Sequence, residues 1–124
     1  MQKYKVLFIG LGTMGYHMSS FLSLNNKLDL HIYNRTKNKS TKWLKKFSGK
    51  IFDFKSDIKF DFIITCLKDD IAINLITNKI LKSNCFKKTT IFIDHSTISL
   101  DQVKKIYNLT NKKFHFLDAP ITGG

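Results

Sequence analysis

Short apolar runs alternate along this chain with longer segments whose apolar residues recur every three or four positions. A strand covered on both faces is continuously apolar, whereas a helix buries only one stripe, so the alternation predicts βαβ units. The predicted fold class is α/β, with helices packed on a mainly parallel sheet of about six strands. The predicted strands cover residues 5–9, 28–33, 51–52, 60–67, 90–93 and 114–117.

The segments between these strands carry apolar stripes at helical spacing. Two helices are predicted over about residues 13–24 and 39–47, the second burying Trp43, Leu44 and Phe47. Two more follow Asp69–Asp70 and the capping-box sequence Ser99-x-x-Gln102. Their apolar residues are Ala72, Leu75, Ile76 and Ile80 in one helix, and Val103, Ile106 and Tyr107 in the other. Asp69 and Asp70 are interpreted as helix caps rather than as a catalytic pair.

The first predicted strand ends in Gly10, Gly12 and Gly15, spaced G-x-G-x-x-G, before a helical pattern formed by Met14, Met18, Phe21 and Leu22. Between a strand and a helix this spacing predicts a dinucleotide-binding turn, and hence a doubly wound sheet of the Rossmann type. Gly10 permits the tight turn, Gly12 the close approach of a pyrophosphate, and Gly15 close packing of helix on strand. A structural turn without a ligand is the alternative, which the strand–helix context disfavours.

The second predicted strand ends at Asn34-Arg35-Thr36, where this fold places the acid that binds the ribose of NAD. Asn34 is neutral and does not repel a 2′-phosphate, Arg35 can bind one bidentately, and Thr36 can donate a hydroxyl. Lys37 and Lys39 add positive charge. The tripeptide therefore predicts NADP, with NAD as the alternative cofactor and a surface turn as the ligand-free alternative.

Open α/β sheets bind ligands at the carboxyl ends of their strands. The loops expected at that edge contain small and polar residues that can offer hydroxyls and backbone N–H groups to a substrate: Ser96, Thr97, Thr122, Gly123 and Gly124. His95 lies beside them, but a single histidine in a loop is more often structural than catalytic. No catalytic role is assigned to it.

A length of 124 residues and a hydrophobic content of 43% fit a single domain over residues 1–124. No apolar run approaches the roughly 18 residues that span a membrane, and the first one is too short for a signal peptide. The expected location is cytoplasmic, without a membrane partner. Cys66 and Cys85 lie far apart and form no C-x-x-C motif, so free thiols and no metal site are expected.

The formal net charge of +12 raises nucleic acid as a partner. Arg35 is, however, the only arginine, and the lysines are dispersed along the chain. Nucleic-acid sites favour arginine for bidentate contacts, so nucleic-acid binding is the less favoured hypothesis. The basic surface still attracts an anionic cofactor.

Four motifs in order resemble those of the β-hydroxyacid dehydrogenase family, which includes 3-hydroxyisobutyrate dehydrogenase, tartronate semialdehyde reductase and, more distantly, 6-phosphogluconate dehydrogenase. The motifs are Gly10-Leu11-Gly12-Thr13-Met14-Gly15, Asn34-Arg35-Thr36, Ser96-Thr97-Ile98-Ser99 and Asp118-Ala119-Pro120-Ile121-Thr122-Gly123-Gly124. The resemblance covers residues 5–124. It implies the NADP-binding domain of an oxidoreductase that transfers hydride between NADP(H) and a small hydroxy acid or its semialdehyde or keto form.

The resemblance also assigns residues to parts of the ligands. It implies that the pyrophosphate is held by the glycine loop with Leu11, Thr13 and Met14, and the adenosine end by Asn34, Arg35 and Thr36. It implies that the cofactor cleft is lined by Leu67 and Thr97. The substrate would be held by Ser96, Thr122, Gly123 and Gly124. Leu100 replaces a common proline, Thr122 a common serine, and His95 a usually apolar residue. These departures affect the inferred substrate more than the inferred cofactor.

In the family, an all-helical domain and a catalytic lysine follow the double glycine, and this sequence ends at Gly124. The expectation is a domain truncated before that helical part, with no catalytic residue of its own and an exposed sheet face that promotes self-association. A homo-oligomer or a separately encoded helical half is then the expected protein partner. A non-catalytic dinucleotide-binding or relic protein is the alternative.

Overall fold

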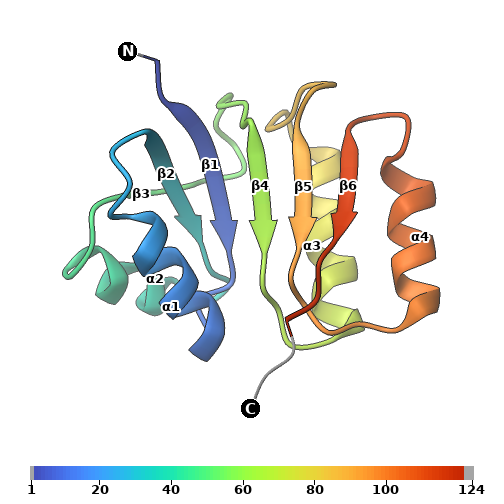
Figure 1. Cartoon of the computed structure of the whole chain (residues 1–124), viewed down its shortest axis with the longest axis horizontal. Coiled ribbons are helices and arrows are strands. Elements are labelled where there is room, and N and C mark those ends of the chain that lie inside the picture. The colour runs from blue at the N-terminus through green and yellow to red at the C-terminus, as the bar shows by residue number, and fades with distance from the viewer. Residues whose placement is uncertain (1, 122–124) are drawn as a thin grey trace.

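The computed structural model describes residues 2–121 and shows a doubly wound α/β fold of the Rossmann type (Figure 1). Every paired strand of the six-stranded sheet is parallel to its neighbour, in the order β3-β2-β1-β4-β5-β6. The elements are β1 (Tyr4–Ile9), α1 (Thr13–Leu22), β2 (Leu28–Tyr33), α2 (Lys37–Leu44), β3 (Lys50–Ile51), β4 (Phe62–Thr65), α3 (Asp70–Lys82), β5 (Ile91–Asp94), α4 (Leu100–Thr110) and β6 (His115–Asp118).

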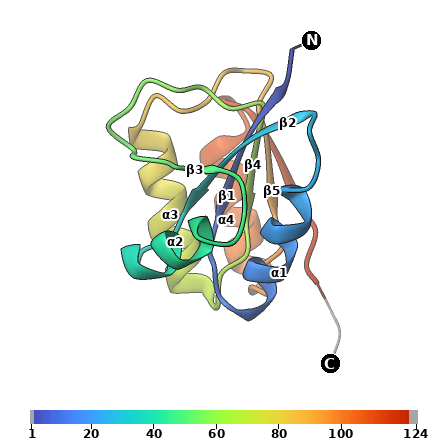
Figure 2. The ribbon, with the colours of Figure 1, turned by 90° about the vertical axis from the view of Figure 1, so that its left-hand side faces the viewer.

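Helices pack on both faces of the sheet, with α1 and α3 on opposite sides (Figure 2). The chain winds outward from β1 to β3, returns to the centre through residues 52–61, and then winds outward again from β4 to β6. The winding direction therefore reverses between β1 and β4. A crevice opens at such a reversal, outside the carboxyl ends of the strands, and this is where doubly wound sheets bind ligands.

Two apolar cores flank the sheet. On the α3 and α4 side, the core includes Leu7, Ile63 and Phe92 of the sheet with Ile73 and Ile106 of the helices. On the α1 and α2 side, it includes Val6, Phe8, Leu30, Ile32 and Trp43. Successive residues of a strand point to opposite faces, so β1 needs apolar residues at every position from Val6 to Ile9. This double burial explains the continuous apolar run that predicted the strand.

The structure corrects several predicted boundaries and apolar stripes. α2 covers Lys37–Leu44 rather than 39–47, and β4 covers only Phe62–Thr65 rather than 60–67. In α1 the buried residues are Gly15 and Ser19, whereas Met14 and Phe21 are 49% and 73% exposed. The reason is close packing, since Ser19 accepts a 2.9 Å hydrogen bond from the buried Trp43 indole of α2. Leu75 of α3 and Tyr107 of α4 are also mostly exposed, because Ile76 and Ile106 beside them fill the core.

One face of β4, β5 and β6 carries no helix among the described residues (Figure 1). Its apolar side chains alternate with those that face α3 and α4, and they are half-buried or exposed: Phe62, Ile64, Ile91, Ile93 and Leu117. A contiguous apolar surface of this kind favours association.

We predict that the 124-residue chain self-associates through this face. Leu117→Lys should shift sedimentation at high protein concentration towards the monomer, because a lysine on an exposed strand face opposes apolar pairing. Leu24→Lys, at an exposed apolar position outside this face, is the matched control and should change nothing. A wild-type chain that stays monomeric at high concentration would contradict the prediction.

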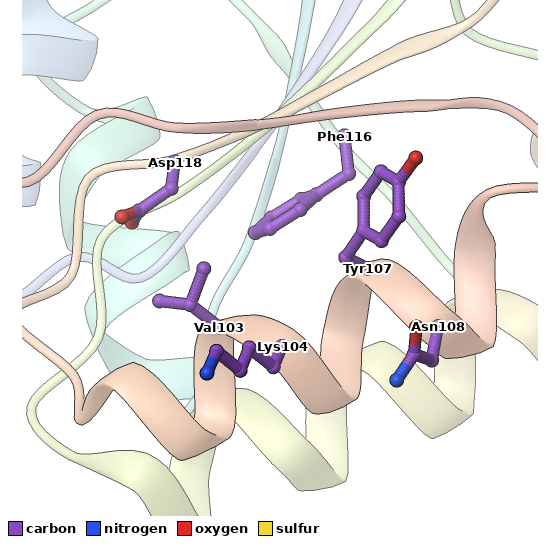
Figure 3. A pocket seen from close by; sticks show the side chains of 6 residues that line it. All are labelled: Val103, Lys104, Tyr107, Asn108, Phe116 and Asp118. Carbon is purple, nitrogen blue, oxygen red and sulfur yellow. The ribbon is translucent and has the colours of Figure 1, made fainter.

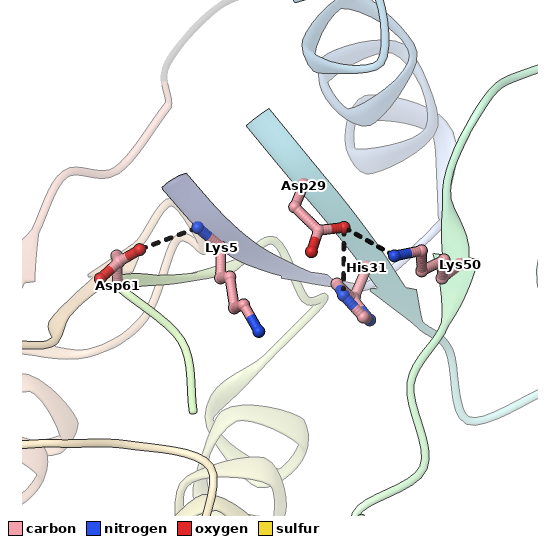
Figure 4. Close-up of polar contacts among 5 residues, drawn as sticks. All are labelled: Lys5, Asp29, His31, Lys50 and Asp61. Carbon is pink, nitrogen blue, oxygen red and sulfur yellow. Dashed lines mark hydrogen bonds and ion pairs between the residues drawn. The ribbon is translucent and has the colours of Figure 1, made fainter. Parts of the chain in front are cut away.

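A polar group lies in the sheet around His31 of β2 (Figure 4). His31 is 3% exposed, its Nε2 lies 3.4 Å from Asp29 Oδ1, and its Nδ1 has no hydrogen-bond partner among the described residues. Burial lowers the pKa of His31 more than the nearby Asp29 carboxylate raises it. Burial would raise the pKa of Asp29, but the hydrogen bond from Lys50 and nearby positive charge outweigh it and lower that pKa. The fold therefore favours neutral His31.

Acidification should destabilise the fold through His31. The unfolded side chain takes up a proton near its ordinary pKa of 6.5, whereas the folded one resists protonation, so the free energy of unfolding falls as the pH drops below about 6.5. Denaturant unfolding at pH values of about 5 to 8 measures this slope. His31→Leu should flatten it, while His115→Gln, at an exposed position, should not. An unchanged slope in His31→Leu would rule out His31 as the cause.

Candidate functional site

The glycine turn after β1 is fixed by two close backbone contacts. Gly10 has a φ of +105°, a left-handed conformation that favours glycine, and a Cβ there would overlap the Cys66 carbonyl oxygen beyond β4. A Cβ on Gly15 would overlap the carbonyl oxygen of Gly10. The turn therefore lies against β4 on one side and against the first turn of α1 on the other.

Gly12 differs from these two glycines, because a Cβ built on it would meet no atom within 4 Å. It is the N-cap residue of α1, and within the described chain no side chain caps that helix start and no acid lies in its first turn. The first N–H groups of a helix lack intrahelical acceptors and carry its positive dipole end. The open space at Gly12 lies beside such N–H groups and leaves room for a phosphate group.

Asn34 joins the glycine turn to the end of β2. Its Oδ1 accepts a 2.8 Å hydrogen bond from the backbone N–H of Leu11, and its Nδ2 donates a 3.0 Å hydrogen bond to the carbonyl of Thr36. Both ends of the amide therefore hold backbone in place, so the side chain positions two predicted ligand-binding segments at once. An aspartate could keep the first contact but not the second.

The segment beyond Asn34 is exposed and positively charged. Arg35, Thr36, Lys37 and Lys39 are all exposed, and Thr36 is the N-cap residue of α2. As in α1, the described residues provide no side-chain cap and no acid in the first turn. A second uncapped helix start thus lies beside Arg35, which suits an anionic group at this end of the crevice.

A pocket of about 340 Å³ joins the glycine turn to the loops beyond β4 and β5. It is lined by Gly12, Thr13, Met14, Gly15, Cys66, Leu67, Lys68, His95, Ser96, Thr97 and Ile121. The structure thus brings the glycine turn, Leu67 and Ser96–Thr97 to one cavity, as expected for strands whose carboxyl ends share an edge. Asn34 is hydrogen-bonded to Leu11 beside this pocket, and Asn34, Arg35 and Thr36 lie outside the pocket lining.

Hydrogen bonds tie the loops around this pocket together. Ser96 is 2% exposed, and its Oγ accepts a 2.7 Å hydrogen bond from the backbone N–H of Leu67. The Nδ1 of His95 donates to the carbonyl of Ala119 at 2.7 Å, which ties β5 to the chain beyond β6. The predicted substrate residues Thr122, Gly123 and Gly124 lie outside the described residues.

Comparison with known proteins assigns the family. The sequence profile of the NAD-binding domain of 6-phosphogluconate dehydrogenase matches residues 5–124. The chain belongs to this family. An uncharacterized oxidoreductase of Shewanella frigidimarina is 34% identical over 124 residues, which cover 97% of this chain and 42% of that protein. The mitochondrial 3-hydroxyisobutyrate dehydrogenase of Drosophila melanogaster is 32% identical over 120 residues, covering 94% of this chain and 36% of that protein.

Solved structures agree on the fold of this NAD-binding domain. The Mycobacterium tuberculosis 3-hydroxyisobutyrate dehydrogenase, solved with L-serine, superposes with a TM-score of 0.86 at 24% identity. The match covers 99% of this chain and 42% of that one. The chain therefore spans about two fifths of the length of the proteins that it matches.

In the acidic pair of this NAD-binding domain, Asp69 caps a helix as the sequence predicts, whereas Asp70 has a different role. Asp69 is the N-cap residue of α3 and accepts a 2.9 Å hydrogen bond from the Ala72 N–H. Asp70 instead accepts hydrogen bonds from the N–H and the hydroxyl of Ser99, the N-cap residue of α4. These two bonds lower the pKa of Asp70. The capping box is only half formed, since Ser99 accepts from the Gln102 N–H but Gln102 donates to Asn74.

Residues beside the pocket that were not predicted from the sequence include Cys66 and Lys68, which line it, and Asp94, whose carboxyl group is wholly buried behind it. An acid within an otherwise apolar strand was the available signal for Asp94. Burial raises the pKa of the Cys66 thiol, and the Asp94 charge raises it further, so Cys66 is not an activated nucleophile.

The remaining surface offers less chemistry. A second pocket of about 440 Å³ lies between α4 and β6, lined by Val103, Lys104, Tyr107, Asn108, Phe116 and Asp118 (Figure 3). No described residue of the predicted site lines it. Across residues 2–121, no three potential metal ligands lie together, and no helix has the length and apolar character to cross a membrane.

Two alanine substitutions should distinguish the glycine with open space around it from the glycine that is packed against backbone. Gly12→Ala should leave the free energy of unfolding nearly unchanged, because its methyl group enters open space. Gly15→Ala should destabilise the domain by about 1–3 kcal/mol or more, because its methyl group overlaps backbone. Urea unfolding measures both. Equal effects of the two variants would contradict the described geometry.

Proposed function

We propose that this domain binds NADP across the β1–β4 crevice and is the cofactor-binding half of an oxidoreductase acting on a small hydroxy acid. The observation that carries the proposal is the meeting of an uncapped α1 and its glycine turn with the β4 and β5 loops in one pocket. Membership of an NAD-binding family supports a dinucleotide as the ligand.

The proposed residue roles follow from position along the crevice. The N–H groups around Gly12, Thr13 and Met14 bind the pyrophosphate, because they lie at the positive end of α1. Leu67 and Thr97 contact the half of the dinucleotide that lies over β4 and β5. Gly10 and Gly15 are needed for the shape of the turn, and Leu11 carries the N–H group that Asn34 holds.

The preference for NADP over NAD rests on the segment after β2. No carboxylate occurs at Asn34, Arg35 or Thr36 to repel a 2′-phosphate, and the exposed Arg35 guanidinium can bind one bidentately. Lys37, Lys39 and the uncapped start of α2 add to the local positive field. The net charge of +12 attracts the anionic cofactor from a distance.

Bound NADP supplies the hydride chemistry, while the protein binds and orients the cofactor and the substrate. We assign substrate contacts to Ser96, Thr122, Gly123 and Gly124, and proton transfer to a lysine and a helical domain outside these 124 residues. A substrate of the hydroxy-acid class is supported by the relative named 3-hydroxyisobutyrate dehydrogenase. On this proposal residues 1–124 form the dinucleotide-binding domain, and a helical part outside these residues completes the site.

Titration with NADPH and NADH, followed by nicotinamide fluorescence, tests the cofactor. Wild type should bind NADPH more tightly. Arg35→Ala should weaken NADPH about tenfold to a hundredfold, the loss expected for charge-assisted hydrogen bonds, and leave NADH within about twofold. Lys112→Ala removes the same charge at an exposed turn beyond α4 and is the matched control.

Three results would overturn parts of this proposal. Preferential NADH binding would refute the assignment of NADP while leaving the dinucleotide site intact. An equal loss of NADPH affinity in Lys112→Ala would refute a local role for Arg35. Salt-sensitive nucleic-acid binding without dinucleotide binding would refute the function itself.

A further inference from the structure

A buried carboxyl group lies directly behind the pocket. Asp94 is the last residue of β5 and is 0% exposed, and the sheet register pairs it with Thr65 of β4 and Asp118 of β6. Carboxyl groups are seldom buried without a specific partner, because burial removes their hydration. This one requires a structural or functional reason.

One oxygen of Asp94 holds the end of β4 and the loop after β5. Its Oδ1 accepts a 2.8 Å hydrogen bond from Thr65 Oγ1 and a 3.0 Å hydrogen bond from the Ser96 backbone N–H. Ser96 in turn accepts the 2.7 Å hydrogen bond from the Leu67 N–H. A chain of bonds thus runs from Asp94 through Ser96 to Leu67, which lies in the pocket lining.

The other oxygen, Oδ2, is buried and has no hydrogen-bond partner among the described residues. Burial raises the pKa of Asp94, hydrogen bonds from Ser96 and Thr65 oppose that rise, and the Asp118 carboxylate adds to it. A buried carboxyl group held on one oxygen alone is a costly arrangement, since the full set of acceptor sites is not used. A core that served packing alone would place an apolar residue here.

We propose that Asp94 is a positioning residue for dinucleotide binding, which acts through Ser96 to place the Leu67 backbone at the pocket. This inference rests on the proposed function. It makes Ser96 primarily the link between β5 and the β4 loop. Asp94 does not touch the cofactor, so its removal should weaken NADPH and NADH alike, unlike the removal of Arg35.

Two substitutions of Asp94 test whether its Oδ1 acts as a hydrogen-bond acceptor that positions the loops or whether the side chain only fills space. Asparagine keeps an Oδ1 acceptor in the same position, whereas alanine removes it and leaves Thr65 and the Ser96 N–H without their acceptor. Asp94→Asn should retain affinity for NADPH and NADH within about threefold of wild type. Asp94→Ala should lose about tenfold or more for both, the effect expected when buried hydrogen bonds are lost.

Thr110→Ala is the matched control for general destabilisation. Thr110 is also 0% exposed and its hydroxyl donates to the Ile106 carbonyl, but it lies in α4 and does not line the pocket. Its substitution should lower the free energy of unfolding without changing cofactor affinity. Amide hydrogen exchange adds a measurement without cofactor, in which the Leu67 N–H should exchange faster in Asp94→Ala than in wild type or Thr110→Ala.

The outcomes separate this inference from the proposed function. If wild type binds neither NADPH nor NADH, the proposed function fails, and the inference with it. If wild type binds and Asp94→Ala binds equally well, or Leu67 exchange is unchanged, the inference alone fails. Loss of affinity in Asp94→Asn equal to that in Asp94→Ala would also overturn it. Should Asp94→Ala not fold, Ser96→Ala breaks the same chain of bonds, and unchanged affinity in that variant would overturn the inference.

Discussion

The site depends on one contact between backbones, where Gly15 of α1 approaches the carbonyl of Gly10 too closely to allow a side chain. This contact sets how near the helix start lies to the end of β1. Gly10 in turn lies against the Cys66 carbonyl beyond β4. The turn after β1 is therefore packed directly against the end of β4. Because neither glycine has a side chain, the start of α1, the turn after β1 and the end of β4 pack closely together. The uncapped start of α1 then faces the crevice.

Two polar side chains hold the neighbouring loops by the same kind of bond. Asn34, after β2, accepts a hydrogen bond from the Leu11 N–H of the loop after β1, and Ser96, after β5, accepts one from the Leu67 N–H of the loop after β4. In each case a side chain that follows the strand next to a central strand fixes a backbone donor beyond that central strand. The edge of the sheet that meets the ligand is thereby ordered by short polar residues, while its centre is ordered by apolar packing.

Much of this structure was predictable from the sequence because its signals are local. Three glycines between a strand and a helix, an acid before α3, a serine before α4, and unbroken apolar runs identified the turn, the caps and the six strands. The errors arose where tertiary packing decides. Met14 and Phe21 follow helical spacing, yet α1 packs through Gly15 and Ser19. Nothing local shows that Asn34 and Ser96 use their side chains on backbone groups distant in sequence.

The order of the strands shows which parts of the fold must come together before the pocket can form. The fold has two halves. Residues 4–51 form β1, β2 and β3 with α1 and α2, and residues 62–118 form β4, β5 and β6 with α3 and α4. In the sheet these halves pair through β1 and β4. Each half therefore completes its own strand pairs within a short stretch of chain, whereas the pocket exists only after the halves dock. A ligand that contacts both halves across the β1–β4 junction binds only the docked state. Its binding therefore opposes separation of the two halves by mass action.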